Sequence, residues 1–314
     1  PRGAGGGGLC LRAAGSVDGS PLADPALGAW LAVEHPRATR TVRNGTLALT
    51  LAQPSPSTAY LASLGAVLPR AAGGGAADEF LWLRRHFGAY LDLVRASAHR
   101  PSVVYGTWYD LRRKPCVDSS PLGQPFCKAA RTLDEPTVTE RLKSVHRELS
   151  KRGAVLDGML LDDGWDNPED PWRVEPSNFP RGLKPLGAAA TKLGASLGVW
   201  ISPWGGFGEG GKHRLRAGAA RGFEAHQDPK TLSLAGPQYG ARVRNASREL
   251  LLHSDVRLFK FDGVGAGMGA TGAGRFVGDV DRLSWLAEEL RGDATGGDIW
   301  VTLSTGAWPS PFWL

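Results

Sequence analysis

The chain has no long apolar run, few cysteines and no concentrated patch of positive charge. None of its 314 residues belongs to an apolar run of about 18 residues, the length that predicts a membrane-spanning helix. Lysine and arginine exceed aspartate and glutamate by 37 to 31, which gives a net charge of +6. These basic residues are dispersed, however, and the longest basic run is only Arg112-Arg113-Lys114. The sequence therefore argues against binding to a membrane and against binding to nucleic acid.

Metal and cofactor motifs are also missing. The chain has three cysteines, Cys10, Cys116 and Cys127, and none lies at a spacing typical of a metal site. Cys116 and Cys127 flank a short loop and would form a disulfide in an oxidising compartment, with free thiols as the alternative. No histidine has a partner at metal-ligand spacing. We expect neither a metal nor an organic cofactor.

Glycine and proline are abundant, with 43 and 22 residues, and they mark the domain organisation. Residues 1–28 form a glycine-rich tail. Residues 29–76 read as the end of an N-terminal β-rich domain and a linker, with the hairpin dipeptide Asn44-Gly45 inside it. Residues 77–314 alternate between strand and helix patterns. Because the chain starts at a proline and ends at Leu314 without a closing helix, we expect it to be an internal piece of a longer protein.

The alternation of strands and helices predicts a parallel sheet with crossover helices. The expected strands are 102–107, 157–162, 197–202, 256–262 and 298–304. The expected helices cover 78–97, 136–152, 183–193, a stretch from 237, and 275–291. No Gly-x-Gly-x-x-Gly follows the first of these strands, which weakens the case for a dinucleotide-binding fold. The pattern instead favours an α/β fold of the (β/α)8 TIM-barrel type, truncated after about the fifth strand, because polar and aromatic residues follow several different strand ends.

Two strand ends carry carboxylates. Residues 160–163 run Leu-Leu-Asp-Asp and are followed by Gly164 and Trp165, while residues 259–263 run Phe-Lys-Phe-Asp-Gly. A buried strand that ends in acidic residues is typical of an active site at the carboxyl edge of a sheet. For Asp162 and Asp163 the plain alternative is a turn that caps a helix. The adjacent Trp165 favours sugar binding, because sugars present apolar faces to indole and hydroxyls to carboxylates.

Lys260 and Asp262 alternate with Phe261, so they point to the same side of their strand. A lysine beside a carboxylate keeps that carboxylate ionised, which suits a nucleophile. A buried structural ion pair is the competing interpretation. Trp204 follows the third strand beyond Pro203 and is a candidate for stacking on substrate, whereas Trp200 within that strand is expected to pack in the core.

The motifs at 161–165, 198–206 and 259–262 together resemble the α-galactosidase clan of glycoside hydrolases. The likeness is to melibiase-type family 36 and its raffinose-synthase-like relatives, and it covers roughly residues 100–314. It implies that Asp262 is the catalytic nucleophile. It also implies that Asp162, Asp163 and Lys260 bind sugar hydroxyls and that Trp165 and Trp204 shape the pocket.

The resemblance implies a retaining glycoside hydrolase that cleaves terminal α-linked sugars, α-galactosides above all, by double displacement. The partner is then an oligosaccharide or glycoside substrate. The family's acid/base aspartate follows the sixth strand and is expected beyond Leu314, so we expect the fragment alone to be inactive. Two alternatives remain open: a sugar-transferring enzyme of raffinose-synthase type, and a non-catalytic carbohydrate-binding barrel.

Overall fold

The computed structural model describes most of the second half of the chain and separate pieces of the first. The described residues are 22–24, 29–33, 39–43, 46–50, 62–66, 76–95, 101–112, 131–227, 230–263, 277–295 and 298–304. All three cysteines, most of the glycine-rich tail, most of the linker and the Asn44-Gly45 dipeptide lie outside these ranges. The chain divides into two compact units, one containing residues 1–100 and the other residues 101–270 and 278–307.

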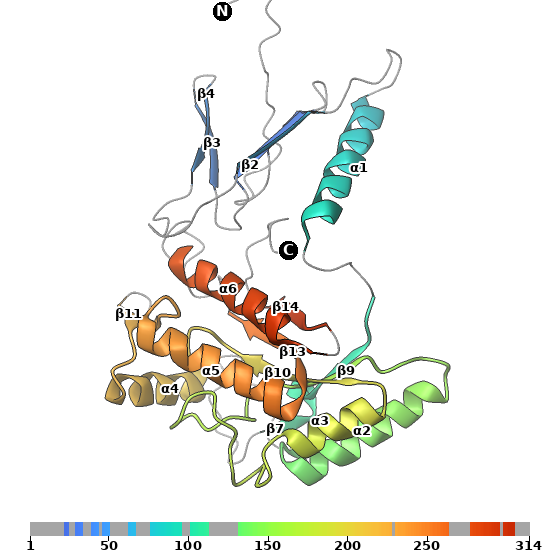
Figure 1. Ribbon diagram of the computed structural model, residues 1–314, viewed down its shortest axis with the longest axis vertical. Coiled ribbons are helices and arrows are strands. Elements are labelled where there is room, and N and C mark those ends of the chain that lie inside the picture. The colour runs from blue at the N-terminus through green and yellow to red at the C-terminus, as the bar shows by residue number, and fades with distance from the viewer. Residues whose placement is uncertain are drawn as a thin grey trace, which may run out of the picture. The chain divides into compact units, whose positions relative to one another are not determined.

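The second unit is built on a five-stranded sheet in which all neighbouring strands are parallel (Figure 1). Its order is β14-β13-β10-β9-β6, so strands consecutive along the chain are neighbours in space. The strands are β6 (Val104–Gly106), β9 (Gly158–Leu161), β10 (Ser196–Ile201), β13 (Val256–Asp262) and β14 (Trp300–Ser304). Each expected strand is confirmed to within two residues at either end.

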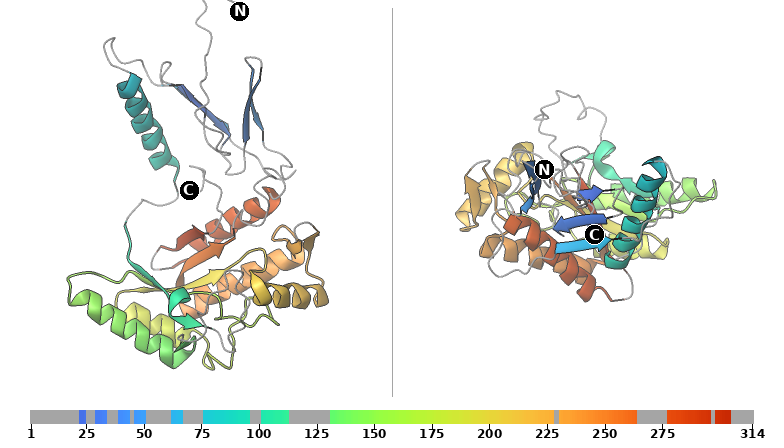
Figure 2. Two further views of the ribbon diagram at one scale, coloured as in Figure 1. Left: turned by 180° about the vertical axis from the view of Figure 1, so that it is seen from behind. Right: turned by 90° about the horizontal axis from the view of Figure 1, so that it is seen from above.

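Helices connect successive strands of this sheet. They are α2 (Glu135–Ser150), α3 (Lys184–Lys192), α4 (Gly208–Ala220), α5 (Pro237–Ser254) and α6 (Val277–Asp293). The helix α3 packs on β10 and α5 packs on β13, while α3 also contacts both α2 and α5, so these three helices form one layer. Front and back views show α2, α3, α5 and α6 along the sheet (Figures 1 and 2). A doubly wound sheet reverses its strand order at a switch point, so the sequential order agrees instead with part of a (β/α)8 barrel.

Short elements lie between the main strands and helices. They are the 3₁₀ helix η1 (Thr107–Tyr109) and the strands β7 (Leu111–Arg112), β8 (Arg131–Thr132), β11 (Ala225–Gln227) and β12 (Lys230–Leu232). The strand β7 pairs with β8, and β11 pairs with β12.

The helix α4 was not expected from the sequence. Four of its 13 residues are glycine, and glycine disfavours an isolated helix by about 1 kcal/mol relative to alanine. Tertiary packing outweighs this propensity, because Arg214, Ala217 and Gly218 of α4 are buried.

The three central strands are buried on both faces. Every residue of β9 is buried, as are five of the six residues of β10. Gly198 lies where β10 passes β13, and a Cβ atom placed on it would be 2.8 Å from the Cβ of Leu258. Burial on both faces explains why these strands read as near-continuous apolar runs rather than alternating ones.

The first unit contains a small antiparallel sheet, a hairpin and a long helix. The sheet has the order β1-β2-β5, from β1 (Leu22–Asp24), β2 (Ala29–Val33) and β5 (Ala62–Ala66). The hairpin pairs β3 (Thr39–Arg43) with β4 (Thr46–Thr50).

The helix α1 (Ala76–Val94) belongs to the first unit rather than to the unit that holds the parallel sheet. The ring of Trp30 on β2 lies 5.5 Å from that of Phe87 and 5.7 Å from that of Tyr90, both on α1. These aromatic contacts bind the helix to β2. The second compact unit starts at Pro101.

Within the part of the chain that is described, no helix combines the length and the apolar composition that crossing a membrane requires.

Gly187 provides a test of the packing between α3 and α5. A Cβ atom placed on Gly187 would lie 1.9 Å from the carbonyl oxygen of Ser254, the last residue of α5. Because a backbone carbonyl cannot rotate away as a side chain can, Gly187→Ala should lower the free energy of unfolding by about 1–3 kcal/mol. The shift in thermal unfolding midpoint measures this. Gly292→Ala in α6 is the control, since a Cβ there meets nothing within 4 Å; equal behaviour of the two variants would contradict the packing.

Candidate functional site

The candidate site lies at the carboxyl ends of β9, β10 and β13. Asp162 and Asp163 follow β9 directly, and the backbone N–H of Asp162 donates to Oγ1 of Thr107 at 2.9 Å. The N–H of Asp163 donates to Oδ1 of Asp162, also at 2.9 Å. The turn between the two aspartates is thus held by hydrogen bonds to its own carboxylate and to the neighbouring η1.

Lys260 pairs with Asp162 and not with Asp262, which corrects the expectation from the sequence. Its Nζ lies 2.7 Å from Oδ2 of Asp162. Lys260 lies opposite Trp200 of β10 in the sheet register, so its long side chain crosses the central strand to reach the end of β9. Lys260 and Asp262 do share one side of β13, but the lysine's charge is paired two strands away.

Burial and charge act on Asp162 in opposite directions. Its side chain is 5% exposed. Burial raises the pKa of Asp162 above its usual range, and it outweighs the ammonium of Lys260 and the backbone N–H of Asp163, which act to lower that pKa. The ionised carboxyl group of Asp162 is therefore poorly solvated even with Lys260 beside it. A ligand that donated a further hydrogen bond would stabilise its charged form.

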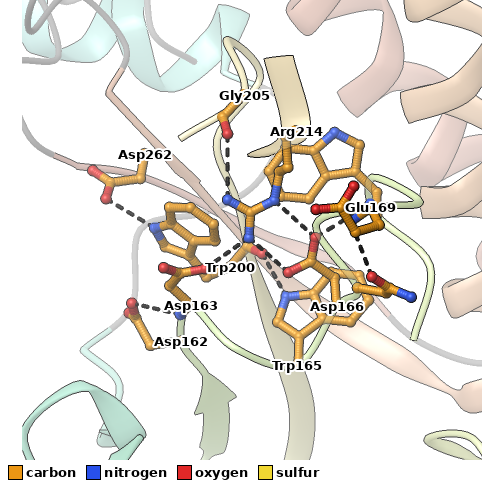
Figure 3. Close-up of polar contacts among 11 residues, drawn as sticks. Asp162, Asp163, Trp165, Asp166, Glu169, Trp200, Gly205, Arg214 and Asp262 are labelled. Carbon is orange, nitrogen blue, oxygen red and sulfur yellow. Dashed lines mark hydrogen bonds and ion pairs between the residues drawn. The ribbon is translucent and has the colours of Figure 1, made fainter. Parts of the chain in front are cut away.

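Asp262, the last residue of β13, is held by three donors from three strand ends. Nε1 of Trp200 donates to its Oδ2 at 2.8 Å. Oγ of Ser304, at the end of β14, and the N–H of Gly263 both donate to its Oδ1 at 2.9 Å. The residue is 8% exposed. These bonds fix the orientation of a carboxyl group that lies at the carboxyl edge of the sheet, and Figure 3 shows the one from Trp200.

The guanidinium of Arg214 links the loops that follow β9 and β10. Its side chain is fully buried. Nη2 donates to Oδ1 of Asp163 and to Oδ1 of Asp166, each at 2.7 Å, and Nε donates to Oδ2 of Asp166 at 2.9 Å. Nη1 donates to the carbonyl of Gly205 at 3.3 Å (Figure 3). The bidentate pairing with Asp166 supplies the geometric specificity of an arginine fork.

Two tryptophans complete the surroundings of Arg214. Its guanidinium carbon lies 4.6 Å from the ring centre of Trp172 and 5.3 Å from that of Trp200. Burial by itself lowers the pKa of Arg214, but the charges of Asp166 and Asp163 outweigh burial, so that the pKa rises above its ordinary value. Arg214 is therefore a permanent buried cation, compensated by two carboxylates and two aromatic faces.

Trp172 adopts a backbone conformation unusual for a residue with a side chain, with φ at +67°. Its N–H donates to Oδ2 of Asp166 at 3.3 Å, and its Nε1 donates to the hydroxyl of Tyr239 at 2.9 Å. A left-handed conformation persists in a bulky residue only when its surroundings hold it there. The hydrogen-bond network of Arg214 and Asp166 therefore continues through Trp172 to Tyr239 of α5.

The two tryptophans expected to contact sugar are largely enclosed. Trp165 is fully buried, and its Nε1 donates to the carbonyl of Trp200 at 2.7 Å. Trp204 is 5% exposed, and its carbonyl accepts a hydrogen bond from the N–H of Leu232. In this arrangement the ring of Trp165 presents no open face, and that of Trp204 presents very little.

Sequence reasoning missed Arg214, Asp166 and Trp172, and it assigned Trp200 only to the core. Trp200 is indeed buried, but its indole also binds Asp262. Asp166, directly after Trp165, could have been noted as a third acidic residue of the same loop. Arg214 gave no local signal, since it lies among dispersed basic residues in a glycine-rich segment whose helix was not expected.

No cluster of three or more histidine, cysteine, aspartate or glutamate side chains within the described ranges has the geometry to hold a metal ion. The site instead combines a buried aspartate, paired with a partly exposed lysine, and a second aspartate held separately. Such an arrangement can bind hydroxyl groups and present a carboxyl oxygen to an electrophilic carbon.

Comparison with solved structures relates this fold to α-galactosidases. The chain matches an α-galactosidase from Thermus thermophilus in complex with stachyose with a TM-score of 0.51 and 16% identity, over 91% of this chain and 55% of that one. It matches an α-galactosidase from Lactobacillus brevis with a TM-score of 0.51 and 12% identity, over 94% and 40%. It matches the galactosidase domain of an α-galactosidase–sucrose kinase with a TM-score of 0.54 and 13% identity, over 95% of this chain and 40% of that one.

These likenesses concern the fold. The chain spans between 40% and 55% of the length of those three proteins. No protein-family model matches the chain, and no curated protein matches its sequence.

The charge balance around Arg214 can be tested by removing it. Arg214→Met leaves Asp166, which is fully buried, without its cation, and breaking a buried pair in this way costs about 3–5 kcal/mol of stability. The free energy of unfolding, followed by chemical denaturation, measures the loss. Arg216→Met, two residues along the same helix at an exposed position, should change stability by no more than about 0.5 kcal/mol. Similar small effects in both variants would show that Arg214 is not the structural centre of the site.

Proposed function

We propose that the protein is a retaining glycoside hydrolase that cleaves terminal α-linked sugars, with α-galactosides as its substrates. The observation that carries the proposal is the pairing of Lys260 with Asp162 beside a separately anchored Asp262. Asp162 and Asp262 lie at the carboxyl ends of β9 and β13, the edge of a parallel sheet at which (β/α)8 barrels hold their active sites, and Lys260 reaches Asp162 from β13. We take the five strands to be part of such a barrel.

Asp262 is the nucleophile in this proposal. In a retaining mechanism a carboxylate oxygen attacks the anomeric carbon, the glycosidic bond breaks, and a covalent glycosyl-enzyme forms, which water then hydrolyses. Trp200, Ser304 and Gly263 support this role because they hold the carboxyl group in one orientation. A fixed nucleophile reduces the entropy that must be lost before the transition state is reached.

Asp162, Lys260 and Asp163 bind the sugar's hydroxyl groups. A carboxylate accepts from a hydroxyl and an ammonium donates to one, so the Asp162–Lys260 pair offers both partners at a single point. Asp163 retains partial exposure, at 29%, while Arg214 holds one of its oxygens. This chemistry needs no cofactor.

Double displacement also needs a general acid, a second carboxyl group about 5–5.5 Å from the nucleophile, to protonate the leaving oxygen and later to activate water. We assign that role to none of the described residues. The resemblance of the fold to α-galactosidases, one of them bound to stachyose, supports a terminal α-galactoside as the substrate class.

Removing the carboxyl group of Asp262 tests the mechanism. In the intact protein, Asp262→Ala should lower kcat on an aryl α-galactoside by roughly 10⁴-fold or more, as loss of a covalent nucleophile does elsewhere. Added azide should restore part of the turnover, because a small anion can occupy the vacated space and attack from the same side. The product would then be the β-glycosyl azide, identified by NMR.

Asp157→Ala is the matched control. Asp157 lies just before β9, at the opposite edge of the same sheet, where its Oδ2 accepts from the N–H of Val103. Its loss should affect stability and leave kcat within about twofold of the unmodified protein. Near-normal turnover by Asp262→Ala, or an equal loss of turnover in both variants, would remove Asp262 from the role of nucleophile.

A further inference from the structure

Phe207 is an exposed aromatic residue beside the candidate nucleophile, and neither the site nor its proposed chemistry has yet used it. Its side chain is 48% exposed, although most large apolar side chains around it are buried. It follows β10 and is the N-cap of α4, directly before Gly208. A half-exposed phenyl ring at the carboxyl edge of a sheet is an apolar surface open to a ligand.

The ring lies against Gly263, the residue after Asp262. A Cβ atom built on Gly263 would be 3.0 Å from Cζ of Phe207 and 3.6 Å from its Cε2, so any larger residue at position 263 would push the ring away. The N–H of Gly263 donates to Oδ1 of Asp262. Phe207 therefore contacts the same backbone unit that orients the carboxyl group of Asp262.

Glycines on both sides of Phe207 hold it in that position. Gly205, Gly206 and Gly208 have φ angles of +102°, +91° and +55°, which residues with side chains rarely adopt. A Cβ on Gly206 would also lie 2.7 Å from Nη1 of Arg214 and 3.0 Å from the ring of Trp200. Gly206 thus packs closely against the buried Arg214, while the neighbouring Phe207 is exposed.

We propose that Phe207 is a specificity-determining residue that packs its ring against the apolar face of the sugar bound at Asp262. A pyranose with an axial hydroxyl at carbon 4 gathers its C–H bonds on one face, and an aromatic ring is the natural partner of that face. Trp165 and Trp204 have little or no exposed ring surface, whereas Phe207 has it. This inference rests on the proposed glycosidase function and names the surface that selects the sugar.

The test uses Phe207→Ala and Phe207→Leu in the intact protein. Leucine keeps apolar bulk and removes the flat ring; tyrosine is unsuitable, because a hydroxyl on Cζ would enter the space of Gly263. Both variants should raise KM for an aryl α-galactoside and the inhibition constant of free galactose by roughly three- to tenfold. The value of kcat should change by less than about twofold, since the ring makes no bond to the reacting atoms. Leu252→Ala, at an exposed position on α5, should leave all three constants unchanged.

The outcomes separate this inference from the proposed function. If the unmodified protein cleaves α-galactosides and both Phe207 variants retain its KM and galactose inhibition constant, the role of Phe207 is overturned and the function stands. If kcat falls while the galactose inhibition constant stays the same, the ring acts on catalysis rather than on sugar binding, and the inference also fails. If the unmodified protein neither cleaves an α-glycoside nor binds galactose by calorimetry, both proposals fail.

Discussion

The buried guanidinium of Arg214 is the interaction on which the arrangement of the site depends. It ties Asp163 and Asp166 after β9 to the carbonyl of Gly205 after β10. A buried charge of this kind is tolerated only when its partners are complete, so the loops that supply those partners have little freedom to move. The same guanidinium lies over the ring of Trp200, whose indole N–H holds Asp262. Arg214 of α4 thus contacts Asp163, and it also contacts Trp200, which binds Asp262.

In the structure Lys260 and Asp262 have separate partners, whereas the sequence suggested that they form one pair. Proximity along β13 suggested that Lys260 supports Asp262, but the lysine crosses β10 to pair with Asp162. Asp262 relies on neutral donors from Trp200, Ser304 and Gly263 instead. In the proposed mechanism the charged pair binds hydroxyl groups of the sugar, and the carboxyl group held by neutral donors attacks its anomeric carbon. That division is the physical basis for assigning binding to one group and attack to the other.

The sequence predicted the repeating elements well because their signals are local. Apolar runs marked the five strands, helical spacing marked α1, α2, α5 and α6, and Gly194 marked the end of α3. The helix α4 escaped because its glycines oppose helix formation, and only burial of Arg214 and its neighbours explains it. The motif residues Asp162, Asp163 and Asp262 lie at strand ends, as expected from an apolar run that stops at a carboxylate, and Lys260 lies within β13 on the same side as Asp262. Their side-chain partners on other strands and helices could not be predicted, since these contacts join residues 42 to 98 positions apart.

The central claim is that a carboxyl oxygen of Asp262 forms a covalent bond to the sugar. Incubating the intact protein with a mechanism-based fluoroglycoside of the α-galactoside type slows the breakdown of the glycosyl-enzyme, and peptide mass spectrometry then locates the attached sugar. The account predicts a single modified peptide with the label on Asp262, and protection from labelling by added galactose. A label on Asp162, Asp163 or any other residue would contradict it, as would time-dependent inactivation without a covalent adduct.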